Sequence, residues 1–226
     1  MDPVFFLFSI CFVVGAVPAD VPAGNAVTAD VVVYGANAGG VLASVAAARG
    51  GASVALLCEQ WPDCFPPSLR IGGLTTGGLS FTDSCRQSDS EQTDPCQLSI
   101  TGGLSKAFFN RSASTYGNWP NTLSGPNMPY NNEPHVALRV LHELLAEESQ
   151  NLSLHYSAEV SRVVKSNSNA AITSITLSDG RVFNGKTFVD SSYTGDLMAA
   201  AGVDYTVGRE ANTTYNESMA GRNPLP

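Results

Sequence analysis

Three glycines and one glutamate within residues 35–59 form the pattern that best matches a ligand site in this chain. Gly35, Gly39 and Gly40 follow an apolar run at 31–33, and Glu59 lies 19 residues beyond Gly40. Glycines in a strand-to-helix turn let a phosphate approach the backbone, where the helix N-terminus offers free N–H groups. A carboxylate about 20 residues later can accept hydrogen bonds from ribose hydroxyls. The pattern therefore predicts a dinucleotide site.

The elements that would position this site are a strand, a helix and a second strand. Residues 30–34 indicate a buried parallel strand, 38–49 an alanine-rich helix, and 53–59 the next strand. Asn37 replaces the usual middle glycine; asparagine tolerates a left-handed backbone, but its side chain occupies space near the phosphates. A carboxylate at Glu59 repels a 2′-phosphate, which favours FAD or NAD over NADP. The alternative is an ordinary glycine-rich turn without a ligand.

Composition narrows the class of partner. The chain has 226 residues, of which 43% are hydrophobic, and a net charge of −8, which suits one α/β domain or one domain with part of another. Nucleic acid and anionic membranes are not expected as partners, because they demand clustered Lys and Arg. His135, His142 and His155 lack metal-ligand spacing, so we predict no metal site. No residue can be assigned as a catalytic base.

The N-terminus carries the features of a secretory signal. Residues 1–19 contain a short apolar stretch that ends in small residues, which predicts a signal peptide cleaved before Asp20. The segment has Asp2 and no Lys or Arg, so an uncleaved anchor is the alternative. After cleavage, we expect no membrane attachment and a secreted protein, extracellular or in the lumen of the secretory pathway.

Cysteines and glycosylation sequons agree with secretion. Without the signal peptide, an even number of cysteines remains, which suggests two disulfides and allows three pairings. Short local loops favour Cys58–Cys64 and Cys85–Cys96. Asn-X-Ser/Thr sequons predict a glycoprotein; their asparagines are Asn110, Asn151, Asn212 and Asn216.

The rest of the chain alternates loops with regular elements. Residues 71–83 are glycine-rich, with leucines and a phenylalanine that suggest a packed segment facing a ligand. Periodicity predicts a short helix at 100–110 and a clear helix at 134–148, capped by Asn131 or Asn132. Strands are expected at 152–156, 159–165, 172–177, 182–183 and 186–190, with a tight hairpin turn at 178–181.

Three later stretches, at 71–83, 130–141 and 188–221, sharpen this interpretation. They read IGGLTTGGLSFTD, then YNNEPHVALRVL, then FVDSSYTGDLMAAAGVDYTVGRE followed by YNESMAG at 215–221. Together with the first βαβ unit, they resemble the FAD-dependent oxidoreductase family whose members are often labelled xanthan-lyase-like. The resemblance covers nearly all of residues 29–221, and that family's turn often lacks the middle glycine too.

The resemblance implies a Rossmann-like, α/β FAD-binding domain of the glutathione-reductase type, with a βαβ unit plus a β-meander, at 29–221. The pyrophosphate would lie on the 35–40 turn, and Glu59 would bind the adenosine ribose. The flavin would lie along 72–79, and the Val160 backbone would contact adenine. The strand end at 190–196 would return to the cofactor. The candidate cofactor-binding residues are Gly35, Asn37, Ala38, Gly39, Gly40, Glu59, Gly72, Gly73, Leu74, Thr75, Val160 and Asp190. Family members are usually longer, so we expect a truncated domain without the C-terminal return segment and substrate cap.

The leading functional hypothesis is a secreted FAD-dependent oxidoreductase that transfers a hydride from a small-molecule or saccharide substrate, of unknown identity, to flavin. One alternative is a non-catalytic secreted glycoprotein, or a truncated fragment, that keeps the dinucleotide-binding scaffold. A polysaccharide lyase is a weaker alternative, because that chemistry needs a positioned His or Tyr and a cationic clamp, and the sequence does not assemble such a set.

Overall fold

A computed structural model describes residues 26–59, 70–79, 102–116, 133–168 and 171–218. The predicted signal peptide, Asn131, Asn132 and the cysteines other than Cys58 lie outside these residues. The elements, in chain order, are β1 (Ala26–Tyr34), α1 (Ala38–Arg49), β2 (Val54–Leu57), the 3-10 turn η1 (Gly73–Thr75), α2 (Gly103–Ser114), α3 (Pro134–Glu147), β3 (Leu152–His155), β4 (Val160–Lys165), β5 (Ile172–Leu177), β6 (Val182–Asp190), α4 (Asp196–Ala200) and α5 (Asn212–Tyr215).

A six-stranded sheet in the order β3-β2-β1-β6-β5-β4 organises the molecule. β1 is parallel to both β2 and β6, and β2 is parallel to β3, whereas β5 runs antiparallel to β6 and β4. Val33 stands opposite Leu56 on one side and Val189 on the other. The carboxyl ends of four parallel strands therefore meet at one edge, where ligands bind in open α/β sheets.

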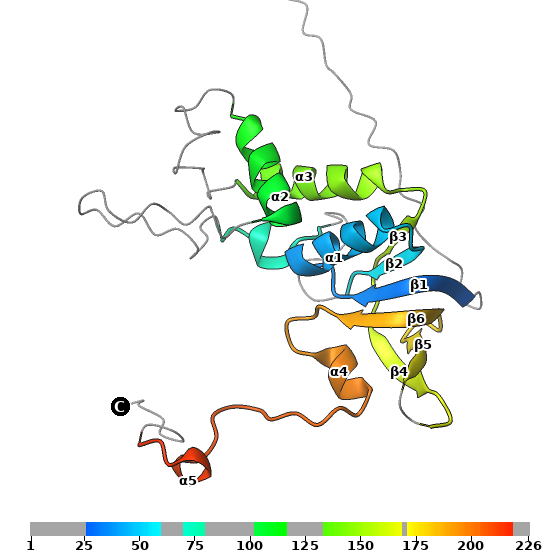
Figure 1. Cartoon of the computed structure of the whole chain (residues 1–226), viewed down its shortest axis with the longest axis vertical. Helices are drawn as coiled ribbons and strands as arrows, with labels where there is room; N and C mark the ends of the chain where they lie inside the picture. The colour runs from blue at the N-terminus through cyan, green and yellow to red at the C-terminus, as the bar shows by residue number, and fades with distance from the viewer. Residues whose placement is uncertain (1–25, 60–69, 80–101, 117–132, 169–170, 219–226) are drawn as a thin grey trace, which may run out of the picture.

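β2 and the carboxyl end of β1 are buried on both faces, as their apolar runs predict. Val33 and Leu56 pack with the helices, while Val32 and Leu57 pack with the β-meander, because successive side chains point to opposite faces. In Figure 1, α1, α2 and α3 lie together over the strands β1, β2 and β3, and α4 lies at the other end of the sheet, against β4 and β6. This layering confirms the predicted Rossmann-type α/β class with a meander.

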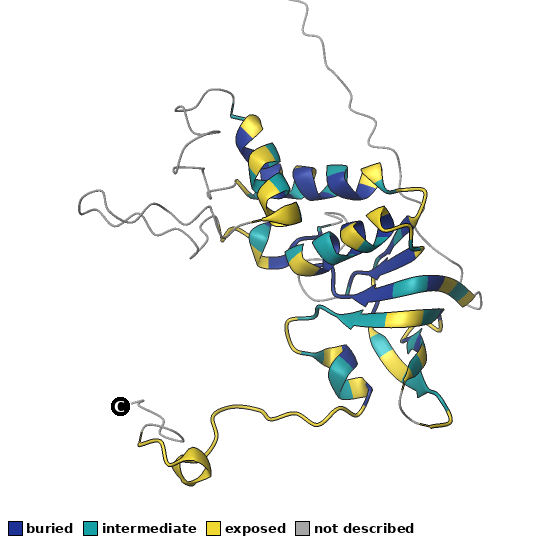
Figure 2. Cartoon of the chain, in the orientation of Figure 1, coloured by how far each residue is buried: buried dark blue, intermediate teal, exposed yellow. Residues whose placement is uncertain are grey.

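α3 provides the largest apolar face of the helical layer. Its buried residues follow helical spacing, and Figure 2 shows dark blue, buried segments along α3. The predicted helix at 134–148 is confirmed to within one residue, but its N-cap is Glu133 rather than Asn131 or Asn132. Pro134 occupies the first turn, where its missing N–H costs nothing.

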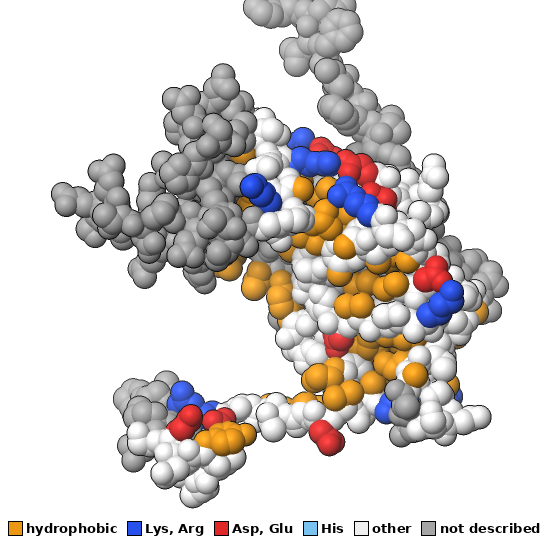
Figure 3. All heavy atoms as spheres, viewed as in Figure 1, with side chains coloured by type: hydrophobic (Ala, Val, Ile, Leu, Met, Phe, Trp, Pro, Cys, Tyr) orange, Lys and Arg blue, Asp and Glu red, His pale blue; other side chains and the backbone are white. Residues whose placement is uncertain are grey.

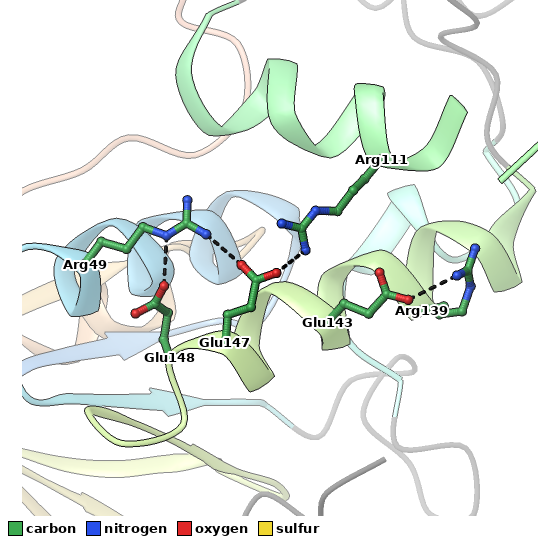
Figure 4. Close-up of polar contacts among 6 residues, drawn as sticks. All are labelled: Arg49, Arg111, Arg139, Glu143, Glu147 and Glu148. Atoms are coloured by element: carbon green, nitrogen blue, oxygen red, sulfur yellow. Dashed lines mark hydrogen bonds and ion pairs between the residues drawn. The ribbon is translucent and has the colours of Figure 1, made fainter. Parts of the chain in front are cut away.

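Ion pairs tie the three helices together on their outer side. Glu147 of α3 pairs with Arg49 of α1 at 2.9 Å and with Arg111 of α2 at 2.5 Å, and Arg49 also pairs with Glu148 (Figure 4). Figure 3 shows these charges gathered over the helical layer. The side chains are partly exposed, so each pair stabilises weakly, but the network fixes how α1, α2 and α3 meet.

The structure corrects four expectations. The strands predicted at 182–183 and 186–190 are one strand, β6, because Gly185 continues the strand while the side chains of Val32 and Phe188 lie over it. The helix predicted at 100–110 is α2, which ends four residues later. Leu74 and Leu79 are exposed rather than packed. The two short helices α4 and α5 were not predicted.

After α4, residues 202–218 run away from the sheet as an exposed arm that carries α5 (Figures 1 and 2). Its apolar side chains include Val207 and Tyr215, both largely exposed. Among the residues that the structure describes, no helix combines the length and apolar character needed to cross a bilayer.

Candidate functional site

The turn between β1 and α1 is the tightest point of the site. Gly35 has a φ of +99°, and a Cβ there would lie 2.6 Å from the backbone of Ser191 and Ser192. A Cβ on Gly40 would collide with the carbonyl oxygen of Gly35. Only glycine fits at both positions, so the helix can begin directly against the carboxyl end of the sheet.

Asn37 closes this turn with its side chain. It is the N-cap of α1, and its Oδ1 accepts a hydrogen bond of 3.0 Å from the Gly40 N–H and one of 2.9 Å from the Ser191 Oγ. Its amide nitrogen donates to the Ser191 carbonyl. The Asn37 backbone is extended, with φ −67°, so the left-handed tolerance considered from the sequence is not used. The asparagine instead joins the turn to the loop after β6.

The cap leaves the Gly39 N–H as a backbone donor at the start of α1. No described hydrogen bond uses this N–H, whereas that of Gly40 is taken by Asn37. The Ala38 N–H faces the Gly72 carbonyl in the parallel bridge between Asn37 and Gly72. The first N–H groups of a helix have no partner within the helix, and they lie at the positive end of its dipole. α1 has 12 residues, so this end can hold an anionic group against Gly39.

The predicted flavin-side segment lies beside this turn. The Gly72 N–H donates to the Ala36 carbonyl at 2.7 Å, and Gly72 forms an isolated parallel bridge with Asn37. The chain then turns through η1, where the Thr75 N–H returns to the Gly72 carbonyl. The structure thus brings Gly72, Gly73, Leu74 and Thr75 beside the 35–40 turn, and their place along the flavin stays a prediction.

Thr76, which directly follows η1 and was not predicted as a site residue, anchors this turn. This side chain is fully buried, and its hydroxyl donates to the Ile71 carbonyl at 2.6 Å. The second half of the anchor is Tyr193, whose hydroxyl accepts the Leu74 N–H at 2.7 Å. A threonine within a glycine-rich run is the only sequence signal that could have pointed to the first contact.

Glu59 follows β2 by two residues and lies among other carboxylates. Burial, together with the charges of Asp196 and Asp190, raises the pKa of Glu59 to about 7. Burial, with smaller effects from the same three carboxylates, raises the pKa of Tyr34 to about 12. The carboxyl ends of β1, β2 and β6 therefore converge on a half-buried acceptor, which is what ribose hydroxyls require.

Asp190 ends β6, as predicted, but its carboxylate is used within the protein. One oxygen accepts from the backbone N–H and the hydroxyl of Ser192, at 2.9 and 2.7 Å, and the other accepts from the Met198 N–H at 2.7 Å. Asp190 thereby holds loop 191–195 and the start of α4. Its place at the cofactor edge agrees with the sequence, while its contacts indicate a supporting role.

Val160 begins β4 beside the end of β1. Its N–H donates to the Tyr34 hydroxyl at 3.4 Å. A contact between adenine and this N–H would have to displace the tyrosine hydroxyl. The adenine role implied by the resemblance stays a prediction.

Cys58 precedes Glu59 and is completely buried. The other cysteines lie outside the described residues. The proposed pairing of Cys58 with Cys64, and that of Cys85 with Cys96, stay predictions. A cross-link at this point would fix the chain where it leaves β2 for the ribose position.

Comparison with known proteins identifies the family. The family described as FAD dependent oxidoreductase matches residues 30–224, which span the whole site. This chain belongs to the FAD-dependent oxidoreductase family. No curated protein sequence matches the chain.

Comparison with solved structures includes one that supports the fold. L-proline dehydrogenase from P. horikoshii is similar with a TM-score of 0.50 and 15% identity, over 82% of this chain and 59% of that protein. A flavin monooxygenase from Stenotrophomonas maltophilia has a TM-score of 0.42 and 17% identity, over 73% of this chain and 38% of that protein. The chain thus spans about three-fifths of the length of the dehydrogenase, and at this identity the likeness shows the fold alone.

The residues present fit FAD. The glycine-lined turn admits a pyrophosphate against the start of α1, where no described hydrogen bond uses the Gly39 N–H, and Glu59 can accept from the ribose hydroxyls. Within the described residues, no group of three or more His, Cys, Asp or Glu could hold a metal ion.

We predict that Asn37→Ala destabilises the protein by about 1–2 kcal/mol, because α1 loses its cap and the turn loses its contacts with Ser191. Asn167→Ala is the matched control, since Asn167 is exposed in the β4–β5 turn. Urea unfolding of both variants measures the difference. Equal midpoints for the two variants would contradict the bridging role of Asn37.

We also predict that Glu59→Gln stabilises the cofactor-free protein at pH 8 and not at pH 4. The folded-state pKa of Glu59 is raised to about 7 from its ordinary 4.5. Between these values the folded state keeps a proton that the unfolded state has released, so stability falls as pH rises through this window. Because the group is half-exposed, we expect a gain of only about 1 kcal/mol at pH 8.

The measurement is urea unfolding at both pH values, with the exposed Glu159→Gln as control. A gain for Glu59→Gln that is the same at pH 4 and pH 8 would show that the carboxyl does not titrate in this window.

Proposed function

We propose that this chain is the FAD-binding domain of a secreted oxidoreductase that oxidises a small organic molecule or a saccharide. The observation that carries the proposal is the turn that only glycine can form, set against the Gly39 N–H at the start of α1 and the acceptor Glu59. When bound, FAD supplies the chemistry by accepting a hydride from the substrate. The chain's own residues bind and orient the cofactor.

The described residues of the site do not indicate which substrate is oxidised. Nothing in the described residues provides a paired acid and base of the kind a lyase needs, so the xanthan-lyase-like label stays a prediction from the resemblance. The leading candidate is hydride transfer, because the chain belongs to the FAD-dependent oxidoreductase family and the glycine turn leaves room for FAD.

The test is flavin retention by the full chain. We expect that the purified protein, incubated with FAD and freed of loose flavin, keeps a flavin absorption spectrum. Gly40→Ala should lose the flavin, because a Cβ there collides with the Gly35 carbonyl. Gly102→Ala is the matched control, since a Cβ there meets nothing within 4 Å.

A milder variant covers the case in which Gly40→Ala fails to fold. Gly39→Ala would place a Cβ 3.3 Å from Asn37 Oδ1, a contact that small shifts can relieve. The added methyl group would also reduce the space for the phosphate. We expect this variant to bind flavin more weakly and to show the circular dichroism spectrum of the folded wild-type protein. A wild-type protein that stays colourless would instead favour the non-catalytic glycoprotein.

Secretion and glycosylation are part of the proposal. The asparagines of all four sequons are exposed, so attached glycans would not disturb the core: they are Asn110, Asn151, Asn212 and Asn216. We expect the chain to reach the medium of eukaryotic cells, and an N-glycosidase to lower its mass and convert occupied asparagines to aspartate. A chain without residues 1–19 should remain inside the cells and carry no glycan. Equal export of both forms would contradict the signal-peptide assignment.

A further inference from the structure

Tyr193 is a large aromatic residue that leaves most of its ring uncovered while its hydroxyl is engaged. Its relative exposure is 57%, yet its hydroxyl accepts the Leu74 N–H at 2.7 Å across 119 residues of chain. A tyrosine that mainly serves core stability buries its ring. Here the specific interaction is the hydrogen bond to η1.

The backbone of η1 is shaped to receive this tyrosine. Gly73 has a φ of +55°, and a Cβ there would collide with the Tyr193 hydroxyl and lie 2.9 Å from its Cζ. The glycine therefore allows the aromatic ring to lie directly against the turn. The contact needs both the Tyr193 side chain and the absence of a side chain at Gly73, so it is specific to this pair of residues.

The loop that carries Tyr193 has two anchors, one on each cofactor segment. Ser191 bonds to Asn37 at the start of α1, and Tyr193, two residues later, bonds to Leu74 in η1. The Asp190 carboxylate holds the same loop by accepting two hydrogen bonds from Ser192. Loop 191–195 thus sets the spacing between the pyrophosphate turn and η1.

We propose that Tyr193 is a positioning residue of the cofactor site, which holds η1 at the spacing from the 35–40 turn that FAD requires. Its hydroxyl acts through the Leu74 N–H, and removing it frees the Leu74 part of η1, while the Gly72 N–H stays bonded to the Ala36 carbonyl. This inference rests on the proposed function, because it assigns a residue to the binding of the same cofactor.

The test compares Tyr193→Phe with Tyr205→Phe in the full chain. Tyr205 lies on the exposed arm with 56% exposure, close to that of Tyr193, and is the matched control. Phenylalanine keeps the ring and removes only the acceptor. We expect Tyr193→Phe to bind FAD about threefold to tenfold more weakly, to shift the flavin absorption bands, and to leave the thermal midpoint of the cofactor-free protein equal to that of the control.

A second readout needs no cofactor. In the cofactor-free protein, deuterium exchange at the Leu74 amide should be faster in Tyr193→Phe than in Tyr205→Phe, because the N–H has lost its acceptor. Unchanged exchange would overturn the contact. Faster exchange with unchanged FAD affinity would overturn the positioning role while leaving FAD binding in place. A wild-type protein that binds no FAD would overturn the proposed function and the cofactor role of Tyr193 together.

Discussion

The close approach of the Gly35 turn to the loop after β6 is the constraint on which the site depends. β1 and β6 pair in parallel through the middle of the sheet, so Ser191 emerges beside a turn that lies more than 150 residues earlier in the chain. No side chain fits between the Gly35 backbone and that of Ser191. The resulting contact sets where α1 begins and which of its N–H groups remain free for a ligand.

Asn37 shows how a departure from the usual glycine fingerprint can keep its function. A middle glycine leaves the turn open, whereas Asn37 fills it with two contacts to Ser191 and one to the Gly40 N–H. The cap consumes the Gly40 N–H, and the Gly39 N–H is left for an anion. The family assignment covers residues 30–224 and therefore includes this turn, although Asn37 stands in place of the middle glycine.

Charge at the site is divided between supporting and binding roles. The Asp190 carboxylate is satisfied by hydrogen bonds within its own loop, so it stabilises the carboxyl edge of β6. Glu59 lacks such donors in the described contacts, and its neighbours raise its pKa. Ionisation of this carboxyl is costly without a donor and becomes more favourable when ribose hydroxyls donate to it. Cofactor binding is thereby linked to the pH dependence of stability.

The sequence alone determined the βαβ unit, the amphipathic helix α3 and the hairpin turn before β6. These features follow from local rules: apolar runs, helical periodicity and a glycine in a tight turn. It also determined Glu59 as the acidic residue at ribose spacing. The same local rules divided β6 at Gly185 and predicted buried side chains at Leu74 and Leu79, and both predictions were wrong.

Tertiary structure decided which distant segments meet. The contacts of Ser191 with Asn37 and of Tyr193 with Leu74 each join residues more than 100 positions apart, and no local periodicity reports on them. It also decided that Asp190 turns its carboxylate inward and that Val160 donates to Tyr34. The physical reason is that strand pairing, set by burial of both faces of the whole sheet, brings the ends of β1, β2 and β6 to one edge, whereas a sequence pattern fixes only the element in which each residue lies.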